Sequence, residues 1–254
     1  MPLNLSDVTF VIPFRYDSPE RLRNLRNVVS YLNHHFETNI IIYEDAPTRM
    51  FTDTGKFTYR FFPNSNPLMH RTKMLNDMVK ESKTPIVVMY DTDVVLPIKN
   101  YLESTILIRN NVFDVIYPYG GRFLNIENPG LISQIILTKD VENIREAECH
   151  CIHPNSVGGA IFFNKQKFIE GGMENEYCVS WGFEDTELST RFPKLGYRVH
   201  RVQGPLFHLH HPASTNSANT GHSAFSNNQN EYNKVASMDP ATLRNYVNTW
   251  TWLK

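Results

Sequence analysis

The sequence predicts an α/β protein whose mostly parallel central sheet is flanked by helices. Two observations lead to this fold class: short apolar strands alternate with amphipathic helices, and charged residues directly follow several of the strands. The 254 residues, of which 41% are hydrophobic, can bury a substantial core and fit one large domain. General disorder is therefore excluded, and we expect a single domain with a C-terminal helical extension.

Five elements are expected in the first ninety residues. The strands are rich in β-branched and aromatic residues, and the helices carry apolar residues at helical spacing. Ser18 is suited to cap the first helix, and Pro19 fits the first helical position that follows it. In chain order the expected elements are strand Val8–Phe14, a helix opening at Ser18, strand Asn39–Tyr43, helix Pro67–Lys80 and strand Pro85–Tyr90.

The remainder of the chain contains a weaker alternation of strands and helices. Residues Glu127–His153 are poorly periodic, so we expect a partly helical excursion over the sheet edge. Residues Ala213–Asn230 are dense in Ser, Asn, Thr and Gly, which predicts a loop or lid. The other expected elements are helix Leu96–Arg109, strand Phe113–Tyr117, strand Val157–Phe163, helix Glu184–Leu195, strands Tyr197–Val202 and Leu206–His210, and a terminal helix Pro240–Trp252.

Composition excludes several classes of protein. The formal net charge of −1 argues against a nucleic-acid partner, since it gives no bulk positive field. No apolar run approaches the roughly 18 residues of a membrane span, and we expect no signal peptide because no basic region followed by an apolar segment precedes Val8. Cys149, Cys151 and Cys178 form neither a disulfide framework nor a four-ligand zinc pattern, which favours reduced thiols in a cytoplasmic protein.

Charged residues gather where the predicted strands end. Arg15, Glu44, Asp45, Asp91 and Asp93 all follow strands, and ligands bind outside the carboxyl ends of strands in open α/β sheets. Two carboxylates one residue apart after an apolar strand cannot both be buried without a partner. A hard divalent cation shared with a phosphate would provide that partner, whereas a solvated turn is the simpler alternative.

A histidine cluster strengthens the metal hypothesis. Five of the ten histidines fall within His200–His222, and His208, His210 and His211 are nearly adjacent. Imidazole combined with carboxylate and phosphate oxygens suits Mn²⁺ better than Mg²⁺, which remains the alternative cation. A zinc site of the HExxH type is disfavoured, because no Glu lies inside the cluster.

A loop at Trp181–Glu187 combines an indole ring and a glycine with carboxylates at a predicted helix start. Acidic residues favour the first turn of a helix through its dipole, which is the simpler explanation of Glu187. Such a loop could also cover the apolar face of a sugar with Trp181, while a carboxylate accepts a hydroxyl proton.

These phrases together resemble GT-A glycosyltransferases, most closely the β-1,4-galactosyltransferase group with its bacterial family-2 relatives. The resemblance extends over about residues 8 to 211, and it is the order of the phrases that makes it specific. The matching phrases are Ile12–Arg15, His70–Asn76, Tyr90–Pro97, Val157–Gly159, Phe163–Phe168, Trp181–Asp185, Lys194–Gly196 and His208–His211.

The resemblance implies a role for each matching position. The metal site would consist of Asp91, Asp93, His208 and His211, with Asp93 a direct ligand and Asp91 acting through the sugar or a water. Asp185 would be the catalytic base, and Glu184 would hold a substrate hydroxyl. The acceptor would contact Trp181 and Gly182. The nucleotide sugar would be bound by Pro13, Phe14, Arg15, Glu44, Asp45, Arg71, Lys73, Asp91, Gly158 and Gly159.

The implied activity is inverting, metal-dependent transfer of galactose or N-acetylgalactosamine from a UDP-sugar to a carbohydrate acceptor. Residues 1–212 would form the catalytic domain, with a nucleotide-binding half to about 95 and an acceptor-binding half beyond it; residues 213–254 would form a mobile loop and C-terminal helices. The enzyme would be cytoplasmic, with room for peripheral association at the inner face of a membrane. The alternatives are a non-catalytic carbohydrate- or nucleotide-binding module and a sugar-nucleotide pyrophosphorylase, although no Gly-rich basic loop follows the first strand.

Overall fold

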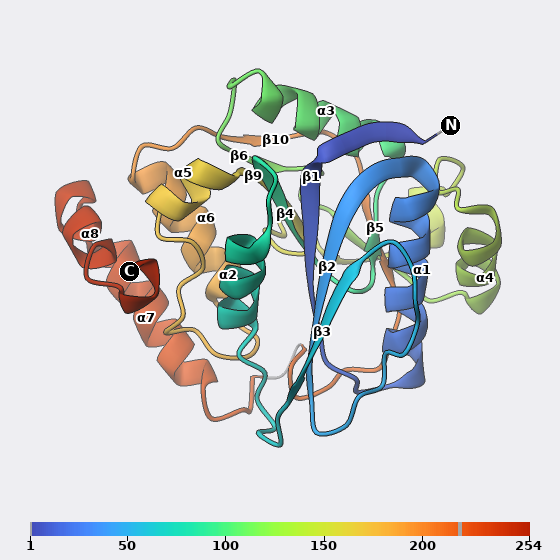
Figure 1. Ribbon diagram of the computed structural model, residues 1–254, viewed down its shortest axis with the longest axis horizontal. Coiled ribbons are helices and arrows are strands. Elements are labelled where there is room, and N and C mark those ends of the chain that lie inside the picture. The colour runs from blue at the N-terminus through green and yellow to red at the C-terminus, as the bar shows by residue number, and fades with distance from the viewer. Residues whose placement is uncertain (1, 218–219) are drawn as a thin grey trace.

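The computed structural model describes residues 2–217 and 220–254, in which two sheets are surrounded by helices (Figure 1). The larger sheet has seven strands in the order β10-β6-β9-β4-β1-β2-β3. Its strands are β1 (Leu3–Phe14), β2 (Phe36–Ala46), β3 (Thr58–Pro63), β4 (Ile86–Tyr90), β6 (Val115–Tyr117), β9 (Ala160–Asn164) and β10 (Val199–Arg201).

The predicted α/β class is confirmed, and the large sheet is mixed. Strand β9 runs antiparallel to both of its neighbours, β4 and β6, whereas the other pairs are parallel. The start of β9 therefore lies beside the carboxyl end of β4, with Ala160 opposite Tyr90. This arrangement brings the Gly158–Gly159 pair to the same sheet edge as Asp91.

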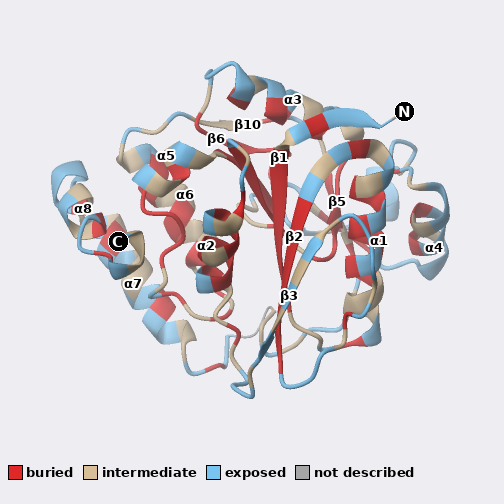
Figure 2. Ribbon diagram, viewed as in Figure 1, coloured by how far each residue is buried: buried red, intermediate tan, exposed pale blue. Residues whose placement is uncertain are grey.

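The core lies on both faces of the large sheet, because the central strands alternate between them. Phe10 and Ile12 of β1 face a cluster that includes helices α1 (Pro19–His35) and α3 (Ile98–Arg109), while Val11 faces the opposite cluster with helix α2 (Arg71–Glu81). Figure 2 shows that β4 and the second half of β1 are buried.

The helix caps agree with the sequence. The Ser18 hydroxyl accepts a hydrogen bond from the Arg21 backbone N–H at 3.1 Å, and Pro19 occupies the first turn of α1. Helices α5 (Lys165–Glu170) and α6 (Glu184–Lys194) belong to the same side of the large sheet as α2, through Phe168, Leu188 and Phe192.

A second, four-stranded sheet carries part of the site. Its order is β5-β11-β7-β8, formed by β5 (Val94–Val95), β7 (Phe123–Ile126), β8 (His150–His153) and β11 (Leu206–Leu209). The predicted excursion at Glu127–His153 contains helix α4 (Pro129–Thr138), a 3₁₀ turn at Glu146–Glu148 and strand β8.

The C-terminal region differs from the sequence-based expectation in two places. Helix α7 (Phe225–Ser237) begins inside the predicted loop Ala213–Asn230, so the helix takes over residues 225–230. Helix α8 (Pro240–Val247) stops before Trp250, and a 3₁₀ turn at Thr251–Leu253 follows it. Trp250 is fully buried in a small cluster with Val235, Leu243 and Val247, so burial of this aromatic ring fixes the chain end.

Among the described residues, no helix has both the length and the apolar character to cross a membrane. Cys149, Cys151 and Cys178 are all free thiols.

Candidate active site

A cleft of about 940 Å³ opens at the carboxyl ends of β1 and β4, and most of the sequence-predicted residues line it. Loops from both sheets form its walls, so residues far apart in the sequence meet there. The predicted residues that line it are Pro13, Arg15, Arg71, Asp91, Asp93, Gly158, Gly159, Trp181, Gly182, Glu184, Asp185, His208 and His211.

Pairing between β5 and β11 brings Asp93 to the histidines. The two short strands run antiparallel with His208 opposite Val94, and the Leu209 N–H donates to the Asp93 carbonyl at 2.7 Å. Two residues of strand pairing thus align the mid-chain carboxylate with imidazoles more than a hundred positions later.

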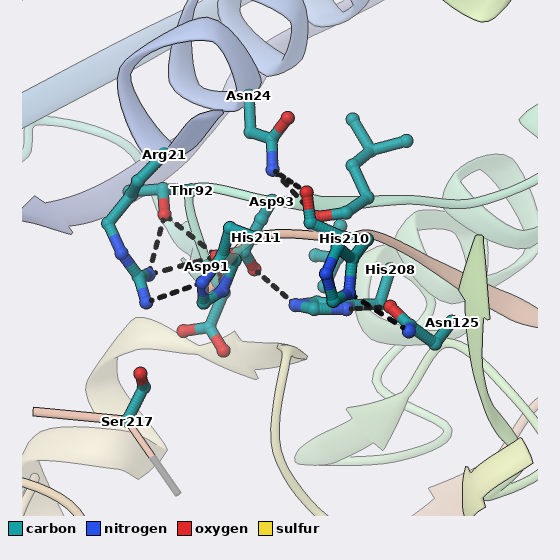
Figure 3. A network of polar contacts seen from close by, with 12 residues as sticks. Arg21, Asn24, Asp91, Thr92, Asp93, Asn125, His208, His210, His211 and Ser217 are labelled. Atoms are coloured by element: carbon teal, nitrogen blue, oxygen red, sulfur yellow. Dashed lines mark hydrogen bonds and ion pairs between the residues drawn. The ribbon is translucent and has the colours of Figure 1, made fainter. Parts of the chain in front are cut away.

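Asp93, His208 and His211 form a compact cluster of ligand atoms. One atom from each residue lies within 4.8 Å of the other two. Nε2 of His208 lies 3.7 Å from Asp93 Oδ1, and Nε2 of His211 lies 3.2 Å from Asp93 Oδ2. Figure 3 shows the three side chains converging from two separate segments.

The histidine orientations fit a divalent cation. Nδ1 of His208 contacts Asn125 Oδ1 at 2.7 Å, and Nδ1 of His211 contacts the Pro212 carbonyl at 2.8 Å. When each neutral ring carries its proton on Nδ1, that N–H donates to the neighbouring oxygen. The lone pair of Nε2 then points toward Asp93. Metal-bound histidines are commonly held in this way. The donor set of one carboxylate and two imidazoles suits a divalent transition-metal cation.

Burial and charge keep His208 and Asp93 in their ligating forms, whereas the contact with Asp93 and its charge outweigh burial and raise the pKa of His211 above its ordinary value. Burial lowers the pKa of His208 to about 4, so this ring is neutral at pH 7. Burial alone would raise the pKa of Asp93, but the contact with His211 and the charge of Arg21 hold it below its usual range. A neutral imidazole beside an ionised carboxylate is what metal binding requires.

Asp91 takes part in a different contact. Its carboxylate accepts a hydrogen bond from Arg71 Nη2 at 2.8 Å, and the metal-ligand cluster found among the described residues does not include it. Arg71 also lies 3.6 Å from Asp185 Oδ1 and 3.9 Å from Glu184 Oε1. One guanidinium therefore faces three carboxylates, and it joins the end of β4 to the start of α6.

Asp185 is a partly buried carboxylate with capacity to accept a proton. Its Oδ1 has no hydrogen-bond partner within the described structure, and its side chain is 24% exposed. Burial raises the pKa of Asp185 to about 8, against the opposing charge of Arg71. By contrast, Glu184 is tied down, because its Oε2 accepts from the Gly182 N–H at 2.7 Å.

The two glycines give the backbone room beside these groups. Gly159 has a φ of +83°, and a Cβ there would lie 2.9 Å from the Phe123 ring. Its carbonyl accepts the Asp91 N–H at 2.8 Å. These contacts hold the start of β9 against the end of β4, where the floor of the cleft forms.

Two aromatic rings, those of Trp181 and Phe225, line the same cleft as Asp185. Trp181 lines the cleft and stacks on Phe225, with ring centroids 6.1 Å apart and an interplanar angle of 16°. Gly182, at a φ of +113°, leaves the space into which Phe225 packs. Phe225 is the first residue of α7, and it was not predicted to line the site because a loop was expected at Ala213–Asn230.

Four predicted nucleotide-binding residues differ from the others in position. Phe14 is buried in the core, and Glu44 accepts hydrogen bonds from the Met50 and Phe51 N–H groups and from the Tyr59 hydroxyl. Lys73 pairs with Asp77 on the exposed face of α2. None of these lines the cleft. Asp45 reaches it only through Arg15, at 3.3 Å.

Two polar residues of the cleft were missed in the sequence. Asn125 of β7 bonds His208, and its Nδ2 lies 3.3 Å from His210 Nδ1. Arg21 of α1 reaches Asp93 at 3.0 Å. The expected amphipathic helix contained a weak signal for Arg21, since this residue follows the capping Ser18 by one turn, but spacing alone does not distinguish it from a solvated arginine.

Comparisons with known proteins give a consistent result. Residues 141–212 match the family described as the N-terminal domain of galactosyltransferase, and no curated protein sequence matches the chain. The catalytic domain of Drosophila β1,4-galactosyltransferase 7, solved with xylobiose, is similar with a TM-score of 0.52 at 16% identity, over 85% of this chain and 76% of that one. This chain has the GT-A fold.

A second solved structure agrees. GalNAc-T7 with UDP, GalNAc and Mn²⁺ gives a TM-score of 0.58 at 12% identity, over 90% of this chain and 47% of that one. The GT-A expectation from the sequence is thereby confirmed, with the sheet mixed as described above.

Proposed function

We propose that this protein is an inverting, metal-dependent glycosyltransferase that moves galactose or N-acetylgalactosamine from a UDP-sugar to a carbohydrate hydroxyl. One observation carries the proposal: the cleft holds both a cation-ligand cluster (Asp93, His208 and His211) and a second group of carboxylates around Arg71. Bound UDP, GalNAc and Mn²⁺ in GalNAc-T7, and xylobiose in the Drosophila enzyme, are compatible with this choice of ligands.

The donor side of the cleft would hold the sugar nucleotide. A divalent cation bound by Asp93, His208 and His211 would supply positive charge that stabilises the leaving diphosphate. Arg15 is held by Asp45 and by the Asn66 carbonyl, to which its Nη2 donates at 2.6 Å, so its position is fixed at the rim. Arg71 supplies a further fixed positive charge beside the donor.

The acceptor side would carry the proton transfer. Asp185 Oδ1 accepts the proton of the attacking hydroxyl, and Arg71 stabilises the ionised carboxylate that must be present first. Trp181 offers an apolar face for the C–H surface of a sugar ring. An acceptor hydroxyl that attacks from the face opposite the leaving group would invert the configuration.

The test is direct binding and turnover of UDP-sugars. Calorimetry should show UDP binding that strengthens with Mn²⁺, and the Asp93→Ala variant should lose this strengthening while Asp77→Ala, which changes an exposed carboxylate on α2, retains it. A screen of UDP-sugars for Mn²⁺-dependent hydrolysis would then identify the donor. Nucleotide binding without turnover of any donor would favour the non-catalytic module, whereas pyrophosphate release from UTP and a sugar phosphate would favour the pyrophosphorylase.

A further inference from the structure

Arg21 places a guanidinium directly against the cation-ligand cluster. Its Nη1 donates to Asp93 Oδ2 at 3.0 Å and lies 3.3 Å from Thr92 Oγ1. Its Nε contacts both carboxylate oxygens of Asp17 at 2.9 Å. The Arg21 side chain is only 14% exposed. Figure 3 shows it pointing toward Asp93 and His211.

The same guanidinium also reaches a ligand histidine. Arg21 Nη2 lies 3.3 Å from His211 Nδ1. This contact is a hydrogen bond only when Nδ1 carries no proton, and Nε2 then carries the proton and faces Asp93. A cation at Nε2 requires the other tautomer, in which Nδ1–H donates to the Pro212 carbonyl. The contact with Arg21 therefore competes with the shorter contact to the Pro212 carbonyl, which is the one that leaves Nε2 free for a cation.

Charge acts in the same direction. A buried carboxylate such as Asp93, whose side chain is 5% exposed, needs a partner of opposite sign, and Arg21 is that partner in the structure. A divalent cation would have to share Asp93 with a fixed positive charge close by. Repulsion between them weakens binding of the cation alone. An anionic diphosphate bound at the same time would offset the excess positive charge.

We propose that Arg21 is a positioning residue that couples binding of the divalent cation to binding of the nucleotide diphosphate. In the free protein it pairs with Asp93 and contacts His211, so that the cation binds well only together with the diphosphate. This inference rests on the proposed function insofar as it takes the cluster to be a cation site. Arg21 thereby disfavours binding of the cation alone and favours binding of the cation together with the nucleotide.

Calorimetric titration of Mn²⁺, with and without saturating UDP, tests the coupling. For the wild-type protein, the Kd of Mn²⁺ should fall when UDP is added. For Arg21→Gln, Mn²⁺ alone should bind about fivefold or more tighter than to the wild type, and the gain from UDP should shrink accordingly. Arg21→Lys keeps the positive charge, so it should retain the weak binding of Mn²⁺ alone.

Arg26→Gln is the matched control, because Arg26 lies on the same helix but pairs with Asp53 outside the cleft. Its Mn²⁺ binding should equal that of the wild type. If a folded Arg21→Gln protein binds Mn²⁺ alone no more tightly than the wild type does, the inference is overturned. The proposed metal site is still supported in that case if the wild type binds Mn²⁺ and Asp93→Ala does not. If Arg21→Gln does not fold, an Mn²⁺ affinity of the wild type that UDP leaves unchanged overturns it equally. Absence of Mn²⁺ binding in every protein, with or without UDP, rejects both the metal site and the inference.

Discussion

The carboxylate of Asp185 fills the space that a side chain on Gly158 would need. Gly158 comes just before β9 and Asp185 lies in the first turn of α6, so the glycine is where two segments of the cleft approach most closely. The Gly158 carbonyl is fixed by the Tyr119 hydroxyl, which donates to it at 2.6 Å. The backbone therefore cannot retreat without losing this hydrogen bond.

Gly158→Ala should reduce turnover by about 100-fold, because the added methyl group displaces Asp185 from its position. The Kd of UDP should change little, since the cation-ligand cluster is not touched. Gly130→Ala, in the first turn of α4 away from the cleft, is the control and should leave turnover unchanged. Steady-state kinetics with a UDP-sugar measure both, and wild-type turnover in Gly158→Ala would show that the exact placement of Asp185 is unimportant.

Asp185→Asn should lower turnover by about 10²–10⁴-fold, as expected for loss of a general base. Because burial raises the pKa of Asp185 to about 8, kcat/KM of the parent should rise with pH and level off above this value. The residual activity of Asp185→Asn should lack this rise. A rise of the same midpoint in the variant would assign the titration to another group.

The same carboxyl group should make the stability of the protein fall as the pH rises, whereas its activity rises. The folded protein raises the pKa of Asp185 from 3.8 to about 8, so it holds the proton more tightly than the unfolded chain does between these values. Stability from this group is present at low pH and declines as the pH rises through that window. Asp185→Asn should therefore melt above the parent at pH 8 and close to it at pH 4. If Asp185→Asn and the parent melt at the same temperature at pH 8 as well as at pH 4, burial does not destabilise the ionised form of Asp185.

Asn125→Ala should weaken Mn²⁺ binding by about 10–100-fold, because His208 loses the oxygen that orients its ring. Asn143→Ala removes an amide that contacts only Asp140 on the exposed surface, and it should bind Mn²⁺ normally. Calorimetry in the presence of UDP measures both affinities. Wild-type affinity in Asn125→Ala would mean that packing alone holds His208.

The segment after His211 should become less accessible when ligands bind. Asn216 already joins it to the rim of the cleft, since its Oδ1 accepts from the Met69 N–H and the Ser180 hydroxyl, each at 2.8 Å. We expect UDP plus Mn²⁺ to slow proteolysis between residues 213 and 224, where the chain precedes α7. Equal cleavage rates with and without ligands would contradict a closing role for this segment.

The parts of the site that the sequence predicted are those fixed by chain direction. Asp91 and Asp93 had to emerge at one edge, because they directly follow an apolar strand, and the dense histidines marked a second contribution. The orientation of individual side chains was not accessible in this way. Lys73 and Arg71 are two residues apart on one helix, so they point to different faces, and only Arg71 enters the cleft.

The fold was predictable where burial leaves a pattern. The strands at the centre of the large sheet were found because their residues are continuously apolar, whereas edge strands β3 and β8, whose residues are exposed or half-buried, were missed. The direction of β9 could not be inferred from its sequence, since parallel and antiparallel strands that are buried on both faces look alike. Helix α7 was hidden by a polar composition, and burial of Asn228 and Val235 fixes it.

The β5–β11 pairing has a consequence for how the protein reaches its native state. Its partners, Val94 and His208, can meet only after the intervening chain has been organised, and closing a loop of that length carries an entropic cost that local helices do not. The cation-ligand cluster should therefore be completed late in folding, after the first helices and central strands have formed. During refolding, Mn²⁺ affinity should therefore be recovered only when β5 and β11 pair, and its recovery would mark the time at which the protein becomes able to bind the cation.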